Sequence, residues 1–252
     1  MTITQQDGAL ELRRLEAAPK PLDRPVVILN GYHGLPRVIS SLTSNLRNAT
    51  SGRDEDFLAV SFFFSASVES AAAAAVDEVN ERWPSVDPDS TVEVDVVALS
   101  MGGIVARWAA LTPEQRAAGA KSPDGTVQTP MRRLRIRRLY TLSSPHRGAA
   151  MAEYIRIDQA AVEMRAGSEF LHGLDAALPA ADYELVCYSQ LRDMTVGATR
   201  AAPDGRPLTW TGGTLLFSHL TITDNTVVLA DIARRLRNEP PLVEPGDPPA
   251  QD

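Results

Sequence analysis

The sequence has a single cysteine, Cys187, among its 252 residues. One cysteine excludes an intramolecular disulfide and argues against a metal site built from cysteines. The four histidines are scattered along the chain, and no two of them have the His-x-x-x-His spacing of a metal-binding helix. We therefore predict no metal site.

Long apolar runs are also missing. No stretch approaches the roughly 18 apolar residues of a membrane-spanning helix, and the apolar run at 71–76 is bounded by Glu69 and Asp77. The first residues lack a basic region followed by an apolar stretch, so no signal peptide is visible. These absences predict no stable membrane insertion and, by default, a cytoplasmic location.

Positive charge is in deficit as well. The formal net charge is −7 at pH 7, and the isoelectric point is about 5.2. This balance argues against nucleic acid or an anionic membrane as the main partner. A local basic cluster at 132–138 alternates partly with apolar residues, and we interpret its arginines as charged residues that flank a strand.

The residues that are present predict a globular α/β protein. Hydrophobic residues make up 44% of the chain and charged residues 23%, which is typical of a soluble globular domain. We expect one domain over 1–238, with a disordered tail rich in proline and acidic residues at 239–252. The predicted strands are 25–29, 57–64, 92–99, 134–142, 184–188 and 214–217. The predicted helices are 37–47, 68–83, 101–111, much of 149–178, and 225–237, with a surface loop at 117–130. This alternation predicts a mainly parallel sheet covered by helices on both faces.

The most informative segment is 92–108, a buried strand that breaks at Ser100 and continues as a helix. A serine on so sharp a turn has strained backbone geometry, which leaves room only for small residues two positions away on each side. The chain supplies Ala98 and Gly102 at these positions. The turn exposes the hydroxyl and directs the amide of Met101 toward a developing oxyanion. This pattern is that of a nucleophile elbow.

Three other strand ends carry polar groups suited to the same chemistry. Ligands of open α/β sheets bind at the carboxyl ends of the strands. After the first strand, Gly31 permits a tight turn that directs the amide of Tyr32 toward the amide of Met101, which predicts an oxyanion hole. Asp193 follows the strand at 184–188, and His219 follows the strand at 214–217. The order Ser, Asp, His is that of a hydrolase triad, with His219 as general base and Asp193 as its orienting acid.

Three further aspartates compete with Asp193 for the role of the acid. Asp175 and Asp182 precede the strand at 184–188, which places them at the wrong edge of the sheet. Asp224 follows His219 by five residues, and with Thr223 it has the position of a cap for the last helix. We therefore favour Asp193.

At this point the chain resembles the α/β-hydrolase fold, and more narrowly the small bacterial lipases and esterases. The matching segments are 26–34, 96–103 and 139–148, together with those around Asp193 and His219. The resemblance implies Ser100 as nucleophile, the triad of Ser100, Asp193 and His219, and the amides of Tyr32 and Met101 as oxyanion hole. The chain departs from the pattern at Asn30, where many relatives have histidine, and at 143–144, where Ser-Ser replaces the commoner Gly-Thr.

The remaining histidines and the 149–178 segment have less defined roles. His33 follows Tyr32 and is a candidate for substrate contact, with a plain loop histidine as the alternative. His146 belongs to a motif that we interpret as structural, and His172 is expected at the surface or near a helix cap. Residues 149–178 lie where this fold commonly inserts a cap. Their apolar side chains either line an acyl pocket or pack on the sheet.

We therefore expect a serine hydrolase that cleaves carboxylic esters through an acyl-enzyme and needs no cofactor. Its substrate would be a small-molecule ester or a lipid. The alternatives are a thioesterase, an amidase or an acyltransferase with the same triad, and a non-catalytic scaffold that binds ligands. The sequence predicts neither the natural substrate nor the oligomeric state.

Overall fold

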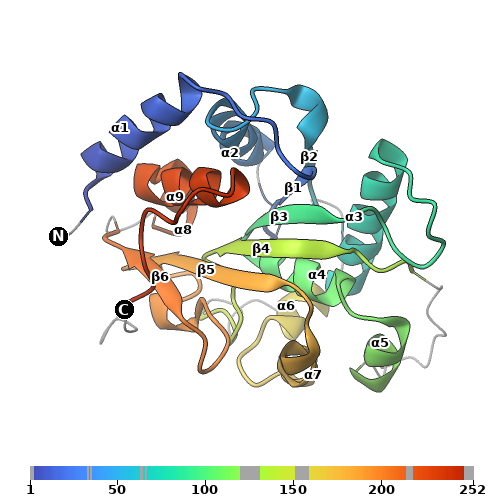
Figure 1. The fold of residues 1–252 in the computed structure, drawn as a ribbon. Coiled ribbons are helices and arrows are strands. Elements are labelled where there is room, and N and C mark those ends of the chain that lie inside the picture. The colour runs from blue at the N-terminus through green and yellow to red at the C-terminus, as the bar shows by residue number, and fades with distance from the viewer. Residues whose placement is uncertain are drawn as a thin grey trace.

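The computed structural model describes residues 3–32, 34, 36–62, 65, 67–119, 131–150, 159–213 and 218–246. In this part of the chain, six strands form one parallel sheet in the order β2-β1-β3-β4-β5-β6 (Figure 1). The strands are β1 (Val26–Leu29), β2 (Phe57–Val60), β3 (Val94–Leu99), β4 (Ile136–Leu142), β5 (Glu184–Gln190) and β6 (Leu208–Thr211). The predicted parallel sheet is confirmed.

Helices cover both faces of this sheet. The α-helices are α1 (Gln5–Glu16), α2 (Pro36–Asn48), α3 (Val68–Arg82), α4 (Met101–Ala109), α5 (Pro113–Gly119), α6 (Gln159–Glu163), α7 (Glu169–Ala177), α8 (Ser218–Thr221) and α9 (Thr226–Leu236). Short 3₁₀ turns are η1 (Asp54–Asp56), η3 (Leu178–Ala180), η4 (Ala198–Arg200) and η5 (Ile222–Asp224). In Figure 1, α1, α2, α8 and α9 lie above the sheet, whereas α4, α6 and α7 lie below it. Within the described residues, no helix is long and apolar enough to cross a membrane.

Successive side chains along β1 point to opposite faces of the sheet, as its pleat requires, and so enter two different hydrophobic cores. Val26 and Ile28 of β1 belong to the cluster that includes residues of α1, α2 and α9. Val27 and Leu29 face the opposite way and join the cluster of α3 and α4. Because every residue of β1 is fully buried, an unbroken apolar run is the only pattern that satisfies both faces.

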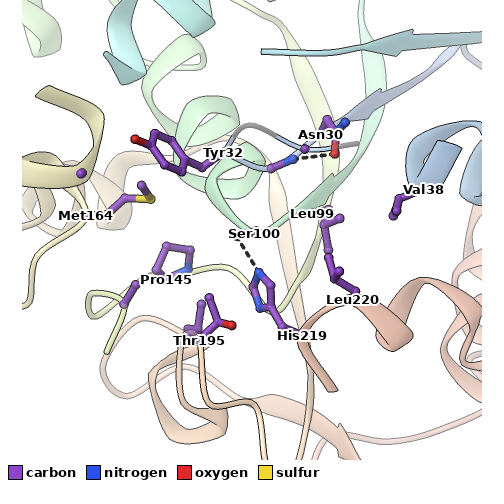
Figure 2. A pocket seen from close by; sticks show the side chains of 15 residues that line it. Asn30, Tyr32, Val38, Leu99, Ser100, Pro145, Met164, Thr195, His219 and Leu220 are labelled. Carbon is purple, nitrogen blue, oxygen red and sulfur yellow. Dashed lines mark hydrogen bonds between the residues drawn. The ribbon is translucent and has the colours of Figure 1, made fainter. Parts of the chain in front are cut away.

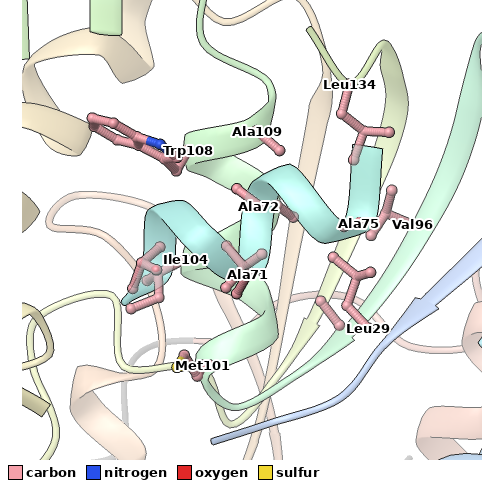
Figure 3. Close-up of a cluster of buried hydrophobic side chains, with 14 of the residues drawn as sticks. Leu29, Ala71, Ala72, Ala75, Val96, Met101, Ile104, Trp108, Ala109 and Leu134 are labelled. Atoms are coloured by element: carbon pink, nitrogen blue, oxygen red, sulfur yellow. The ribbon is translucent and has the colours of Figure 1, made fainter. Parts of the chain in front are cut away.

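The hydrophobic core between the sheet, α3 and α4 contains several small residues of α3. Ala71, Ala72 and Ala75 are fully buried, and they face α4 and the sheet (Figure 3). Alanine side chains let the two helices approach closely, while the ring of Trp108 in α4 packs against Phe170, with centroids 5.1 Å apart. This packing fixes the position of α4, and therefore also that of Ser100, which directly precedes the helix.

Helix α1 is the main element that the sequence did not predict. Thr4 begins it with a capping box, in which the Thr4 hydroxyl accepts from the amide of Asp7 at 3.2 Å and the Asp7 carboxylate accepts from the amide of Thr4 at 2.9 Å. Only Gly8 and Leu15 of this helix are fully buried, so its apolar stripe is too thin to see in the sequence. Gly8 lies against α9, where a Cβ atom would come within 2.6 Å of the Thr226 backbone.

The far edge of the sheet also differs from the expected one. The predicted strand at 214–217 lies outside the described residues, and the described edge strand is β6, at 208–211. Strand β6 was not predicted from the sequence, because the strand is short and follows a segment, 203–207, that contains two prolines and a glycine. The loop predicted at 117–130 begins inside α5, which Thr112 and Gln115 cap reciprocally, and its residues 120–130 lie outside the described ones.

The first part of the predicted disordered tail makes defined contacts instead. The amides of Leu242 and Val243 donate to Oδ1 of the buried Asp231 at 2.5 and 3.1 Å, and the amide of Gly246 donates to the carbonyl of Leu208 at 3.3 Å. A buried carboxylate needs donors, and the tail supplies two of them. Residues 247–252 lie outside the described part.

Candidate active site

Ser100 has the strained turn that the sequence predicts. Its backbone lies at φ 52° and ψ −124°, between β3 and the first residue of α4. Its amide donates to the carbonyl of Leu142 at 2.8 Å, which ties the turn to β4. A Cβ atom on Gly102 would come within 2.6 Å of the Asn30 carbonyl oxygen. Glycine at 102 is therefore required by the close approach of β1, and this contact fixes the direction in which the serine points.

Ser100, His219 and Asp193 form one hydrogen-bonded chain. The Nε2 atom of His219 lies 3.0 Å from Ser100 Oγ, and its Nδ1 atom lies 3.0 Å from Asp193 Oδ2. Figure 2 shows the imidazole directed toward the serine. A carboxylate only accepts, so Nδ1 carries the proton and Nε2 of the neutral ring accepts from the Ser100 hydroxyl. The structure thus brings these three predicted residues together at the carboxyl edge of the sheet.

Asp193 is held on both of its oxygens. While Oδ2 faces His219, Oδ1 accepts from the amides of Thr195 and Val196 at 3.0 and 3.1 Å. Burial by itself raises the pKa of this carboxyl. The hydrogen bond from His219 and its charge, the amide of Val196 and the hydroxyl of Ser143 outweigh burial and hold the pKa of Asp193 below its ordinary value. Asp193 is therefore ionised at neutral pH and accepts the hydrogen bond from His219 Nδ1 as a carboxylate.

The loop after β1 lies directly against the serine. A Cβ atom on Gly31 would be 3.0 Å from the Cβ of Ser100, so a glycine is favoured here by the close approach rather than by a left-handed φ. The buried side chain of Asn30 braces the loop, since its Oδ1 accepts from the Gly31 amide at 2.9 Å. Tyr32 extends from this loop beside the pocket (Figure 2). His33 lies outside the described residues.

Ser100 and His219 both line a pocket of about 180 Å³. Its walls are mostly apolar (Figure 2). The lining residues are Asn30, Gly31, Tyr32, Gly34, Val38, Leu99, Ser100, Pro145, Ala149, Ala161, Met164, Thr195, Val196, His219 and Leu220. The sequence did not single out Pro145, Thr195, Val196 or Leu220, which are near neighbours of residues that it did single out.

The 149–178 segment divides between the two roles expected for it. Ala149, Ala161 and Met164 line the pocket. Phe170, Leu171 and Leu174 pack in or against the hydrophobic core, to which Ala149 and Met164 also belong. The apolar residues at 151, 154, 155 and 157 lie outside the described part.

His146 lies in a separate buried network. Its Nδ1 atom is 3.2 Å from Arg107 Nη1, and its Nε2 atom is 3.0 Å from Thr141 Oγ1. Arginine only donates, so Nδ1 accepts and the proton resides on Nε2. Burial and the charge of Arg107 hold the pKa of His146 well below its ordinary value. A neutral His146 thus anchors the loop that carries Pro145 to the pocket wall.

This network predicts a pH-dependent stability. In the unfolded chain His146 takes up a proton near its ordinary pKa of 6.5, whereas the folded protein keeps it neutral to a much lower pH. The free energy of unfolding should therefore fall by about 1.4 kcal/mol for each pH unit below 6.5 on account of this residue. His146→Gln, whose amide can accept from Arg107 and donate to Thr141, should lack this slope. Urea unfolding at several pH values measures the difference, and parallel pH profiles for the two proteins would refute it.

The competing aspartates lie elsewhere. Asp175 pairs with Arg107 at 2.8 Å, and Asp182 forms an ion pair with Arg133. Asp224 is exposed. The prediction that Thr223 and Asp224 cap the last helix is wrong, because the cap of α9 is Asn225. Among the described residues, no group of three or more potential ligand side chains could hold a metal ion, and His172 is exposed.

No model of a known protein family matches this sequence, and no curated protein matches it either. Solved structures do resemble it. The mature form of the Bacillus licheniformis lipase BlEst2 aligns with a TM-score of 0.55 and 14% identity, over 86% of this chain and 94% of that one. The propeptide form of the same lipase gives 0.58 and 13% identity, over 90% and 53%. This chain spans about half the length of that longer form.

Two further structures come from other organisms. The phospholipase PlaB from Legionella pneumophila aligns with a TM-score of 0.60 and 11% identity, over 87% of this chain and 60% of that one. Lipase B from Aspergillus fumigatus gives 0.54 and 16% identity, over 93% and 58%. At these identities the likeness concerns the fold alone. The parallel sheet flanked by helices and these matches show that the chain has the α/β-hydrolase fold, similar to that of bacterial and fungal lipases.

Proposed function

We propose that this protein is a serine hydrolase that cleaves carboxylic esters, with Ser100 as nucleophile, His219 as general base and Asp193 as orienting acid. The observation that carries the proposal is the hydrogen-bonded chain from Asp193 through His219 to Ser100, which opens into an apolar pocket. Structures with the same fold include two lipases and a phospholipase, which is consistent with ester substrates.

The steps of the proposed ester hydrolysis follow from the protonation states of Asp193, His219 and Ser100. His219 Nε2 takes the proton of Ser100 as Oγ attacks the ester carbonyl, and Asp193 stabilises the imidazolium that forms. The imidazolium then gives this proton to the leaving alcohol, and the acyl group remains on Ser100. A water molecule, deprotonated in turn by His219, releases the acid and restores the serine.

The amides of Met101 and Tyr32 are the proposed donors to the oxyanion. Met101 is the first residue of α4, where a helix amide lacks an intrahelical acceptor. The close approach of Gly31 to Ser100 brings the Tyr32 loop to the same place. Each such donor typically stabilises the transition state by about 2.7–4 kcal/mol.

The size of the pocket predicts the preferred acyl group. A cavity of about 150 Å³ holds a six-carbon ring such as benzene, and this pocket measures about 180 Å³. We expect kcat/KM for nitrophenyl esters to be highest for acyl chains of about four to six carbons and about tenfold lower for palmitate. A series from acetate to palmitate checks this, and a steady rise up to palmitate would contradict the pocket assignment.

The same three residues could serve a thioester or an amide, because a fold and a triad do not select the substrate. A matched panel of an ester, a thioester and an anilide of one acyl group distinguishes these reactions. The ester should be turned over fastest, and faster hydrolysis of the thioester or the anilide would replace the ester assignment. Absence of turnover for all three would favour the non-catalytic scaffold.

A further inference from the structure

The pocket has two sides that meet at Ser100. In Figure 2, Tyr32 and Met164 lie on one side of Ser100, whereas Val38 and Leu220 lie on the other. Both sides line the same cavity of about 180 Å³. An ester also has two parts, the acyl chain and the alcohol, which diverge from the carbonyl group. The cavity therefore has one side for each part of the substrate.

The position of the general base decides which part lies on which side. In the proposed mechanism His219 Nε2 protonates the leaving alcohol, so the alcohol oxygen must come within hydrogen-bond distance of that atom. Leu220 follows His219 directly on α8 and lines the pocket. The alcohol therefore lies on the Leu220 side, and the acyl chain extends from Ser100 toward Met164.

The Met164 side is enclosed, whereas the Leu220 side is open. Met164 is 6% exposed, and two alanines that line the same pocket, Ala149 and Ala161, are 6% and 2% exposed. Leu220, in contrast, is 44% exposed. An enclosed wall limits the length of a bound chain, while an open side lets a larger group extend into solvent.

The backbone that carries Met164 is held in place. The carbonyl of Met164 accepts from the amide of Ala149 at 2.9 Å, and its amide donates to the carbonyl of Ala160 at 3.0 Å. The preceding residue, Glu163, accepts through Oε2 from the amide of Val68 at 2.8 Å, at the start of α3. With the backbone held at these points, the side chain at position 164 determines how far a bound chain can extend.

We propose that Met164 is a specificity-determining residue, whose side chain ends the acyl side of the pocket and sets the longest acyl chain that fits. The proposal rests on the proposed hydrolase function and names the substrate class within it. The substrates are esters of straight-chain acids of up to about six carbons with alcohols of varied size, because the alcohol side is open at Leu220.

The test replaces Met164 by leucine, valine and alanine and measures kcat/KM for nitrophenyl esters from acetate to palmitate. Met164→Leu nearly conserves the volume and should keep the wild-type optimum. Met164→Ala removes every atom beyond Cβ from the closed end, so the optimum should move to chains about two to four carbons longer, with Met164→Val between. Because each buried methylene is worth about fourfold, the ratio of decanoate to butanoate should rise at least about tenfold in Met164→Ala.

Two other variants are the controls. Met194→Ala removes a methionine that is 71% exposed, and it should keep the wild-type profile. Leu220→Ala should change the order of esters that differ in their alcohol, while the optimal acyl length stays the same. Thermal melting checks the fold of each variant, and Met164→Val carries the test if Met164→Ala does not fold. An unmoved optimum in the Met164 variants, or an equal shift in Leu220→Ala, would overturn the proposal.

Ligand binding separates this proposal from the proposed function. Ketones with one long alkyl chain resemble esters but cannot be hydrolysed, and calorimetric titration into Ser100→Ala measures their Kd. Affinity should stop rising at a chain about two to four carbons longer when Met164→Ala is added to Ser100→Ala. If the wild type hydrolyses no ester, the proposed function fails while this shift still supports the role of Met164. The same length dependence in both proteins overturns that role whether or not esters are hydrolysed.

Discussion

Ser100→Ala is expected to reduce the hydrolysis of a short nitrophenyl ester by about 10⁴- to 10⁶-fold, because it removes the oxygen that forms the acyl bond in the proposed mechanism. The fold should be retained. The turn at Ser100 is held by its own amide and by the contact of Gly102 with β1, neither of which involves the hydroxyl.

The control for this variant is Ser40→Ala. Ser40 is exposed on α2, and its hydroxyl donates to the carbonyl of Pro36 at 2.8 Å. Ser40→Ala should keep the wild-type rate, while thermal melting of both variants checks that they are folded. A Ser100→Ala protein with more than about a tenth of the wild-type rate would exclude the acyl-enzyme mechanism.

Asp193→Asn should lower kcat by about 10⁴-fold with little change in fold. The asparagine oxygen can still accept from the amides of Thr195 and Val196, so its amide group then faces His219. An amide nitrogen donates, which forces His219 Nδ1 to accept and places the ring proton on Nε2. In this tautomer the ring can no longer take the proton of Ser100.

Asp224→Asn is the control for the acid. Asp224 follows His219 by five residues and is exposed, so its loss should leave kcat unchanged within about twofold. If Asp224→Asn were the inactive variant and Asp193→Asn the active one, the acid assignment would be wrong. Wild-type activity in both variants would show that no orienting carboxylate is needed.

The sequence predicted the sheet and the polar residues that gather at its carboxyl edge because both leave local patterns. The buried strand β1 is an unbroken apolar run, and the strand-to-helix break at Ser100 has small neighbours that a strained turn requires. Asp193 and His219 were found from their places along the chain. The distances that join them to Ser100 could come only from the structure.

Other features depend on contacts between distant segments, which leave no local signal. Helix α1 buries little of itself and is positioned by Gly8 against α9. The residues after 239 are held by the buried Asp231 of α9 and by the carbonyl of Leu208 in β6. The left-handed φ of Ser143 was likewise invisible, since serine at that position looks like an ordinary small residue.

The central claim is that Ser100 is an activated nucleophile, and covalent labelling by a fluorophosphonate tests it most directly. Such a probe reacts with a serine that is deprotonated by a neighbouring base and spares inert serines. The account predicts one adduct per chain, mapped by mass spectrometry to the peptide that contains Ser100, and none in Ser100→Ala. A wild-type protein that is folded and remains unlabelled, or that is labelled at another serine, would contradict it.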